Sequence, residues 1–215
     1  MIGILDTGTS NIRSVMNACT NNKIEISVIN KYEPPRNFSG IIFPGVGNFG
    51  FVMKQLKKNK LDIFIKDFIK LNRPSLFICV GLQVLFSASE EDDEEKGLNI
   101  IEGFVKKIPI KFKDKINTVP FNGWNHIKLV KKHEILRHLK GEVNSFYFTH
   151  SYYVDPKQKD LILNEVNLNG FNYCSGIIKN NIIGFQFHPE KSSMKGVEIF
   201  KNFSDICKLK NIELK

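Results

Sequence analysis

The chain has 215 residues, 42% of them hydrophobic, and carries a formal net charge of +9. This length and apolar content allow one domain with a sizeable core and argue against disorder and against a membrane protein. The lysines that supply the charge are spread along the chain without an RNA- or DNA-binding motif, so we expect no nucleic-acid partner.

The distribution of apolar residues and cysteines indicates the compartment. No apolar run approaches the roughly 20 residues that span a bilayer, and Met1–Leu5 is typical of a buried strand rather than of a signal peptide. The cysteines form no CxxC pair, which gives neither a zinc site nor a disulfide framework; they are Cys19, Cys79, Cys174 and Cys207. We expect a cytoplasmic protein without metal or cofactor.

The first half of the chain alternates short apolar runs with longer amphipathic ones. The runs predict strands at Ile2–Leu5, Ile24–Ile29, Gly40–Phe43 and Ser75–Ile78. Helical periodicity predicts helices at Ile12–Thr20, at Phe51–Leu71 with a break near Asn59, and at Leu82–Ser89. Such alternation favours a mostly parallel sheet with helices on both faces.

The second half is rich in strands. We expect these at Ile127–Val130, Ser145–Phe148, Tyr173–Lys179 and Ile182–Phe187, before a closing helix at Ser193–Lys208. Asn180-Asn181 fits a two-residue hairpin turn, because asparagine tolerates positive φ. The acidic run Glu90–Glu95 is typical of a solvated loop. An α/β fold with antiparallel C-terminal strands follows, and we expect residues 1–215 to form a single domain.

The segment Ser75–Gln83 places a cysteine between a strand and a helical pattern. Such a strand–nucleophile–helix elbow lifts the side chain of Cys79 out of the carboxyl edge of the sheet. The helix N-terminus favours the thiolate, and the backbone N–H of Val80 would face an oxyanion formed by attack of Cys79 on a carbonyl. The alternative is that Cys79 is a small buried apolar residue, as most core cysteines are.

A second signal is His188-Pro189-Glu190, which follows a strand. Residues two apart in an extended segment share a face, and Pro189 favours extended backbone at His188. Glu190 can therefore orient the imidazole of His188 as a base for a thiol. Alone, this triplet fits an ordinary surface turn. With the cysteine elbow, it completes a nucleophile, a base and an orienting carboxylate.

The stretch Gly45–Gly50 fits the GxGxxG pattern of dinucleotide sites. It follows the third predicted strand rather than the first, and Pro44 interrupts the turn into the next helix. A loop whose amides face an acyl oxyanion explains the glycines equally well.

With these segments together, the chain resembles the class I (triad) glutamine amidotransferases, and within them the glutaminase subunits of imidazole glycerol phosphate synthases. The resemblance covers nearly the whole chain. The segments that carry it are Asp6–Ser14, Pro44–Gly47, Cys79–Gln83, Ser89–Glu91, Pro120–Asn125, Tyr147–Tyr153 and Gln186–Ser192.

The resemblance implies an activity and a partner. Cys79, His188 and Glu190 would release ammonia from glutamine for histidine biosynthesis, within a heterodimer with a cyclase subunit of the (β/α)₈-barrel type. The implied roles of the remaining residues are an oxyanion site (Val46, Gly47, Val80), glutamine binding (Gln83, Glu91, His150, Ser151, Tyr152) and a docking face (Pro120, Trp124, Tyr147). For Trp124, ordinary core packing is an open alternative.

Four residues depart from the family pattern. Phe77 stands two positions before the nucleophile, where the family has glycine, and a bulky group there could crowd the elbow. The other departures are Phe121 in the docking motif and Thr7 and Ser10 near the start. They leave open a paralogue that serves another synthase and an amidotransferase-like chain that is catalytically idle. A free-standing thiol hydrolase is a third alternative.

Overall fold

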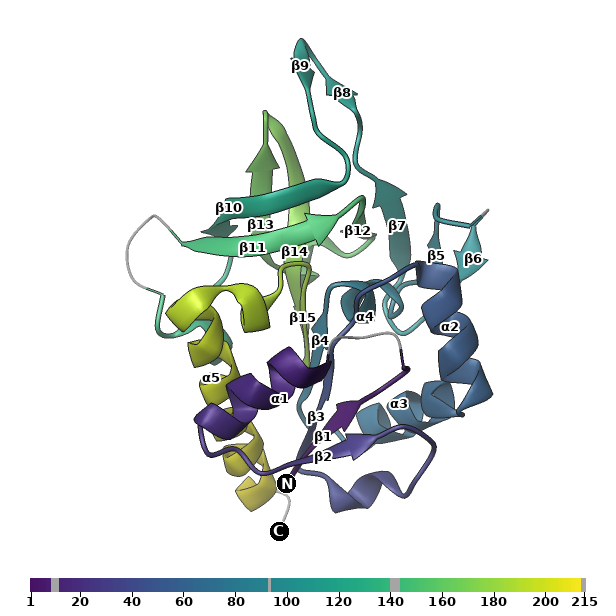
Figure 1. Cartoon of the computed structure of the whole chain (residues 1–215), viewed down its shortest axis with the longest axis vertical. Helices are drawn as coiled ribbons and strands as arrows, with labels where there is room; N and C mark the ends of the chain where they lie inside the picture. The colour runs from purple at the N-terminus through teal and green to yellow at the C-terminus, as the bar shows by residue number, and fades with distance from the viewer. Residues whose placement is uncertain (9–11, 93, 140–143, 214–215) are drawn as a thin grey trace.

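The computed structural model describes residues 1–8, 12–92, 94–139 and 144–213, and Ser10 therefore lies outside the described residues. A parallel sheet forms the lower part of the molecule and antiparallel strands form the upper part (Figure 1). Helices cover both faces of the parallel half, so the predicted α/β architecture is confirmed.

Five neighbouring strands run parallel, in the order β2-β1-β3-β4-β15. Most of them are short and fully buried because helices cover both sides, which explains their continuous apolar sequence. Their bounds are β1 Ile2–Leu5, β2 Ile26–Ile29, β3 Gly40–Phe43, β4 Ser75–Ile78 and β15 Ile182–Phe185. The sequence predicts a start of β2 two residues earlier, and an end of β15 two residues later, than the structure has.

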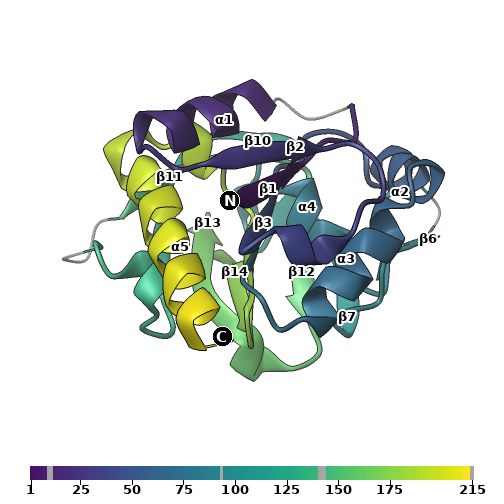
Figure 2. The ribbon, with the colours of Figure 1, turned by 90° about the horizontal axis from the view of Figure 1, so that it is seen from below.

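The helices pack in pairs, one pair on each face of these strands (Figure 2). Helices α1 (Ile12–Asn21) and α5 (Ser193–Glu213) bury Val15 and Phe200 in one core. Helices α2 (Phe49–Lys58) and α3 (Leu61–Lys70) bury residues such as Val52 in the other. Among the described residues, no helix has both the length and the apolar character needed to cross a membrane.

The break between α2 and α3 falls where the sequence predicts it. Asn59 ends α2, and Lys60 has a φ of 55°, a left-handed conformation that no α-helix can continue through. The prediction of one interrupted helical stretch is therefore confirmed.

Antiparallel strands extend the sheet beyond β15. The order continues β14-β12-β7-β5-β6, and β13, β10 and β11 branch from β14. The predicted hairpin joins β14 to β15, with Lys179 opposite Ile182 and Asn180 at a φ of 52°. The bounds are β5 Ala88–Ser89, β6 Glu95–Lys96, β7 Gly103–Lys107, β10 Phe121–Leu129, β11 Ser145–His150, β12 Tyr152–Pro156, β13 Ile162–Leu168 and β14 Phe171–Lys179.

The remaining elements are short. A separate ribbon of β8 (Lys111–Phe112) and β9 (Lys115–Ile116) projects from the top of the molecule (Figure 1). Single 3-10 turns lie at Pro35–Asn37, Glu134–Leu136, Lys159–Leu161 and Pro189–Lys191.

The helix predicted at Leu82–Ser89 is wrong. Helix α4 covers only Val80–Gln83, and Ala88–Ser89 forms β5. The reason lies in the following loop: its amides at Leu98, Ile100 and Asn99 take the carbonyls of residues 84, 85 and 86. A continued helix needs those carbonyls for its own amides four residues on, so the tertiary contacts override the local periodicity.

The predicted acidic loop is only partly free in solvent. The carboxylates of Glu91 and Asp92 accept hydrogen bonds from the amides of Phe49 and Gly50, at distances of 2.9 and 3.2 Å. Acidic groups are favourable at a helix N-terminus, and these two hold the loop against the start of α2.

Candidate active site

Cys79 lies directly after β4, an inner strand between β3 and β15, in the elbow that the sequence predicts. Its backbone is at φ 53° and ψ −115°, a sparsely populated conformation, and its N–H donates to the carbonyl of Phe185 at 2.7 Å. The turn is possible because Gly81 has no side chain: a Cβ there would lie 2.5 Å from the carbonyl oxygen of Phe43. Sterically strained backbone of this kind is concentrated at functional sites.

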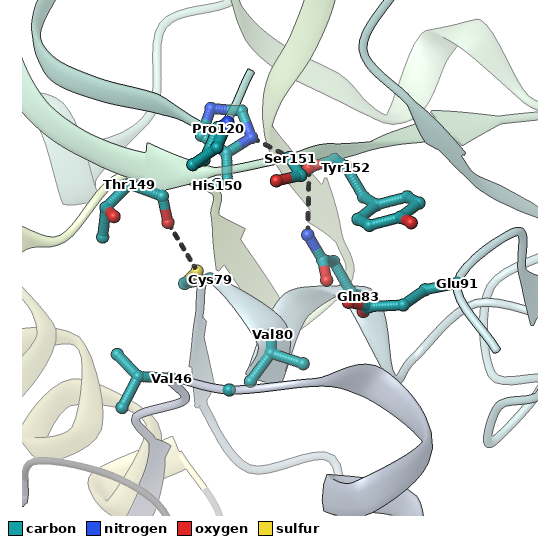
Figure 3. A pocket seen from close by; sticks show the side chains of 11 residues that line it. Val46, Cys79, Val80, Gln83, Glu91, Pro120, Thr149, His150, Ser151 and Tyr152 are labelled. Atoms are coloured by element: carbon teal, nitrogen blue, oxygen red, sulfur yellow. Dashed lines mark hydrogen bonds between the residues drawn. The ribbon is translucent and has the colours of Figure 1, made fainter.

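Cys79 opens onto a cavity of about 250 Å³ (Figure 3). The cavity brings together residues from the loop after β3, from α4, from the acidic loop and from the β11–β12 corner. The structure places there every residue of the predicted oxyanion and glutamine sites, along with one residue of the predicted docking face. The lining residues are Val46, Gly47, Cys79, Val80, Gln83, Glu91, Pro120, Thr149, His150, Ser151 and Tyr152.

The other cysteines differ from Cys79. Burial raises the pKa of Cys19 to about 12 and likewise raises that of Cys174 to about 12, so both are inert thiols. Cys207 is buried at the far end of the fold. Cys79 is distinguished by its place at the cavity, which favours a reactive role over the alternative of a core cysteine.

His188 and Glu190 form a buried pair beside Cys79, with side chains 0% and 5% exposed. The Nδ1 of His188 lies 2.7 Å from the Oε1 of Glu190. Burial alone would lower the pKa of His188, but the neighbouring sulfur of Cys79 and the Glu190 carboxylate outweigh it and raise the pKa to about 10. The second ring nitrogen, Nε2, is buried and makes no hydrogen bond to any described residue, and the sulfur of Cys79 is the neighbouring group that does most to raise the pKa of this ring.

The backbone around this pair differs from the prediction. His188 is extended, but Pro189–Lys191 form a 3-10 turn rather than a continued extended segment. Proline suits the first position of such a turn because its φ is already fixed near the helical value. The turn still brings Glu190 back to His188, so the pairing expected from the sequence occurs by a different local geometry.

Phe77 does not crowd the elbow. Its side chain points to the opposite side of β4 from Cys79, is fully buried in the core with α2 and α3, and meets the ring of Phe43 edge-on at 6.3 Å. Residues two apart share a face of a regular strand, but β4 ends at Ile78 and the positive φ of Cys79 turns the chain there, so the sulfur does not lie on the face of Phe77. The crowding expected from the sequence is therefore wrong.

The glycines of the loop after β3 serve close packing. A Cβ on Gly45 would lie 2.5 Å from the backbone nitrogen of Gly81. Gly47 has a φ of 123°, which side-chain-bearing residues rarely adopt. The glycines thus let this loop approach the elbow and line the cavity opposite Cys79, which accounts for them without a dinucleotide.

A chain of buried polar groups crosses the cavity wall. The Nε2 of Gln83 donates to the carbonyl of Tyr152 and to the Oε1 of Gln186, both at 3.1 Å. The Nδ1 of His150 lies 2.8 Å from the same carbonyl, and its Nε2 lies 3.2 Å from the hydroxyl of Tyr173. Burial lowers the pKa of His150 to about 4, so this ring is neutral.

Glu91 reaches the cavity from the acidic loop. Burial raises its pKa, while the hydrogen bond from the amide of Phe49 acts in the opposite direction. Because its carboxylate holds the start of α2, Glu91 links the cavity wall to the helix that follows the loop carrying Val46 and Gly47.

The predicted docking residues lie at the carboxyl edge of the sheet. Trp124 on β10 is 53% exposed, so the alternative of core packing is wrong for this residue. Its ring meets that of Tyr147 edge-on at 6.2 Å, and the Tyr147 hydroxyl donates to Asn122. Exposed aromatic residues of this kind are typical of protein interfaces. Phe121, next to this pair on β10, packs edge-on against His150 at 6.3 Å.

Two residues at the site were not singled out by the sequence. The carbonyl of Thr149 lies 4.0 Å from the sulfur of Cys79 (Figure 3), and the Nε2 of Gln186 lies 3.6 Å from it. Gln186 stands two residues before His188, so period-two alternation offered a signal for it. Nothing in the sequence could indicate a backbone carbonyl. Among the described residues, no cluster of His, Cys, Asp and Glu could hold a metal.

Comparison with known proteins agrees with this geometry. The model of the family "Glutamine amidotransferase class-I" matches residues 3–206. The chain belongs to this family of glutamine amidotransferases, as its sequence predicts.

Among curated glutamine amidotransferases, similar proteins are subunits of imidazole glycerol phosphate synthase. The chain is 35% identical to the "Imidazole glycerol phosphate synthase subunit HisH" of Moorella thermoacetica, over 96% of this chain and 95% of that protein. It is 39% identical to the protein of the same name from Methanocaldococcus jannaschii, over 96% and 100%.

Solved structures share the fold at low identity. "Structure of PurLQS from Thermotoga maritima" superposes with a TM-score of 0.74 at 15% identity, covering 95% of this chain and 97% of that one. A glutamine amidotransferase from Thermotoga maritima gives a TM-score of 0.61 at 13% identity, covering 99% and 86%.

Proposed function

We propose that this chain is the glutaminase subunit of an imidazole glycerol phosphate synthase. It hydrolyses glutamine to glutamate and ammonia and passes the ammonia to a cyclase, which forms imidazole glycerol phosphate and AICAR in histidine biosynthesis. One observation supports this above all: the sulfur of Cys79 meets the buried His188–Glu190 pair beside a cavity whose other wall carries Val46 and Gly47.

The first half-reaction forms a thioester. The thiolate of Cys79 attacks the side-chain carbonyl carbon of glutamine, and the negative charge moves to the carbonyl oxygen. The amides of Val80 and of the Val46–Gly47 loop are the candidate donors to that oxyanion. When the tetrahedral intermediate collapses, the carbon–nitrogen bond breaks, and His188 gives its proton to the departing amine, which leaves as ammonia.

The second half-reaction restores the enzyme. His188, now neutral, takes a proton from water as the water oxygen attacks the thioester. Collapse of this intermediate breaks the carbon–sulfur bond, releases glutamate and returns the proton-bearing imidazole beside the thiolate. Glu190 favours the imidazolium in both half-reactions because its carboxylate accepts from Nδ1 at 2.7 Å.

The cavity walls suit an amino-acid substrate. Glu91 offers a carboxylate for the substrate ammonium group, and Gln83 and the backbone of His150, Ser151 and Tyr152 offer polar groups for its carboxylate and amide. Because His150 is neutral and already bonded at both nitrogens, we assign it to shaping this wall rather than to proton transfer.

The proposal extends to partner, organisation and compartment. We assign Pro120, Trp124 and Tyr147 to the docking face of a (β/α)₈-barrel cyclase in a heterodimer, supported by the exposure of Trp124 and by the place of Pro120 in the cavity wall. The continuity of parallel and antiparallel strands in one sheet supports a single domain over residues 1–215. Four free cysteines suit a reducing cytoplasm.

The test is glutamate release measured with and without a cyclase and its nucleotide acceptor. We expect turnover only in the complex, and loss of about four orders of magnitude in Cys79→Ala, as when other covalent nucleophiles are removed. Cys174→Ala is the matched control, because it removes a buried thiol away from the cavity. Equal release by Cys79→Ala and the parent would refute the proposal. High turnover without a cyclase would instead indicate a free-standing hydrolase.

A further inference from the structure

Gln186 lies next to the reacting sulfur because of strand register. Strands β4 and β15 run parallel with Ile78 opposite Phe185, so the next residues along, Cys79 and Gln186, are neighbours. The side chain of Gln186 is fully buried, and its Nε2 lies 3.6 Å from the sulfur of Cys79, a normal distance for a hydrogen bond to sulfur.

The direction of this hydrogen bond is fixed by a backbone carbonyl. The oxygen of Tyr152 can only accept, so the group of Gln83 that faces it at 3.1 Å must be the NH₂. The same NH₂ faces Gln186 at 3.1 Å, so Gln186 must present its oxygen there. The amide of Gln186 therefore has only its own NH₂ left to present to Cys79.

The neighbouring histidine supports the same polarity. His150 is neutral and directs one nitrogen to the Tyr152 carbonyl, where it must donate, so its other nitrogen accepts from the hydroxyl of Tyr173. Every group in this hydrogen-bond network then has one consistent role as donor or acceptor. The carboxamides of Gln83 and Gln186 cannot both be flipped, because that would set the Gln83 oxygen against the Tyr152 carbonyl.

We propose that Gln186 is a further residue of the glutaminase reaction, and that its side-chain NH₂ holds the Cys79 sulfur as a thiolate. A buried N–H donor stabilises an anionic acceptor more than a neutral one. The carbonyl of Thr149, 4.0 Å away from the sulfur, can accept only from the protonated thiol. Deprotonation thus shifts the sulfur's hydrogen bonding from Thr149 to Gln186.

This inference rests on the proposed function for the role of Cys79, but its test does not require glutamine. The rate at which iodoacetamide alkylates Cys79 in the full chain is measured against pH, with the modified cysteine identified by mass spectrometry. Other titratable groups around the sulfur are His188 from the turn after β15, with Glu190 behind it, and His150 and Glu91 on the cavity wall; all of these stay unchanged.

In Gln186→Met, which removes the donor at similar volume, we expect the pH of half-maximal alkylation to rise by about one unit. Gln186→Asn, whose shorter side chain cannot reach both Gln83 and the sulfur, is the second variant and should move it the same way. Asn202→Leu is the matched control: this amide is equally buried but bonds to Ile135 and His138. Its loss should leave the alkylation profile unchanged.

The outcomes separate the two proposals. An unchanged midpoint in both Gln186 variants, with glutamate release still dependent on Cys79, would overturn the role of Gln186 and leave the proposed function standing. A raised midpoint in a chain that releases no glutamate with any cyclase would overturn the proposed function alone. If Asn202→Leu raises the midpoint as much as Gln186→Met, the effect is general destabilisation and the inference fails.

Discussion

The contact between the loop after β3 and the elbow can be tested by Gly45→Ala. An added Cβ would lie 2.5 Å from the backbone nitrogen of Gly81 and from the Cγ1 of Val80, and 3.1 Å from the carbonyl of Ile78. Carbon needs roughly 3.5 Å or more from such atoms, so the loop must move away by about 1 Å. Two of the three obstacles, Gly81 and Ile78, are backbone atoms and cannot turn aside.

Such a movement has two calculable consequences. Overpacking of this kind costs about 1–3 kcal/mol in the free energy of unfolding. In the proposed mechanism, the same displacement withdraws the Val46–Gly47 amides from the oxyanion, and the loss of one such donor lowers kcat by about 10²–10³-fold. We therefore expect Gly45→Ala to remain folded and to lose at least about 100-fold in kcat/KM.

The assay is glutamate release with the cyclase and its acceptor present, together with unfolding in urea. Gly170→Ala is the control. Its φ of 95° makes alanine strained, but nothing lies within 4 Å of the added atom, and Gly170 does not line the cavity of Cys79. It should lose stability to a similar degree and keep its kcat/KM. A Gly45→Ala enzyme with kcat/KM within about threefold of the parent would refute the role given to this loop.

Three further outcomes follow from burial and exposure. Phe77→Gly should lower the free energy of unfolding in urea by about 3–5 kcal/mol, because it empties a buried core position. Glutamate release per folded molecule should stay near that of the parent. A large loss of turnover in still-folded protein would contradict the separation of Phe77 from the elbow. The folded His150 has a pKa lowered to about 4 against 6.5 unfolded, so only the unfolded chain binds this proton between those values. The free energy of unfolding should therefore fall as pH falls from about 6.5 to 4, by roughly 3 kcal/mol at most. His150→Gln should show a shallower fall; if the free energies of unfolding of parent and variant change with pH in parallel, His150 has no such effect. Trp124→Ala should change stability by less than about 1 kcal/mol but weaken cyclase binding at least about tenfold by titration calorimetry, whereas Phe104→Ala, similarly exposed at 51%, should bind normally.

The segment proposed for docking illustrates a limit of prediction from sequence. The aromatic pattern around Trp124 fits both a core strand and an interface, and only the 53% exposure of that ring separates them. The reason is that a half-buried antiparallel strand presents alternate residues to core and solvent, and the sequence does not say which face is covered.

The sequence by itself determined the parallel sheet, the cysteine elbow and the histidine–glutamate pair. Those features are written in local order: fully buried strands are continuously apolar, and a strand, a nucleophile and a glycine in succession permit few backbone paths. Even the break near Asn59 was readable from periodicity.

Tertiary structure alone decided the rest. It ended α4 at Gln83, because amides from residues 98–100 take the carbonyls that a longer helix would need. It sent the Phe77 ring into the core, and it set Gln186 beside the sulfur through the register of two strands over a hundred residues apart. Each outcome depends on which distant backbone groups become partners, and that choice is made by the packed fold as a whole rather than by any local pattern.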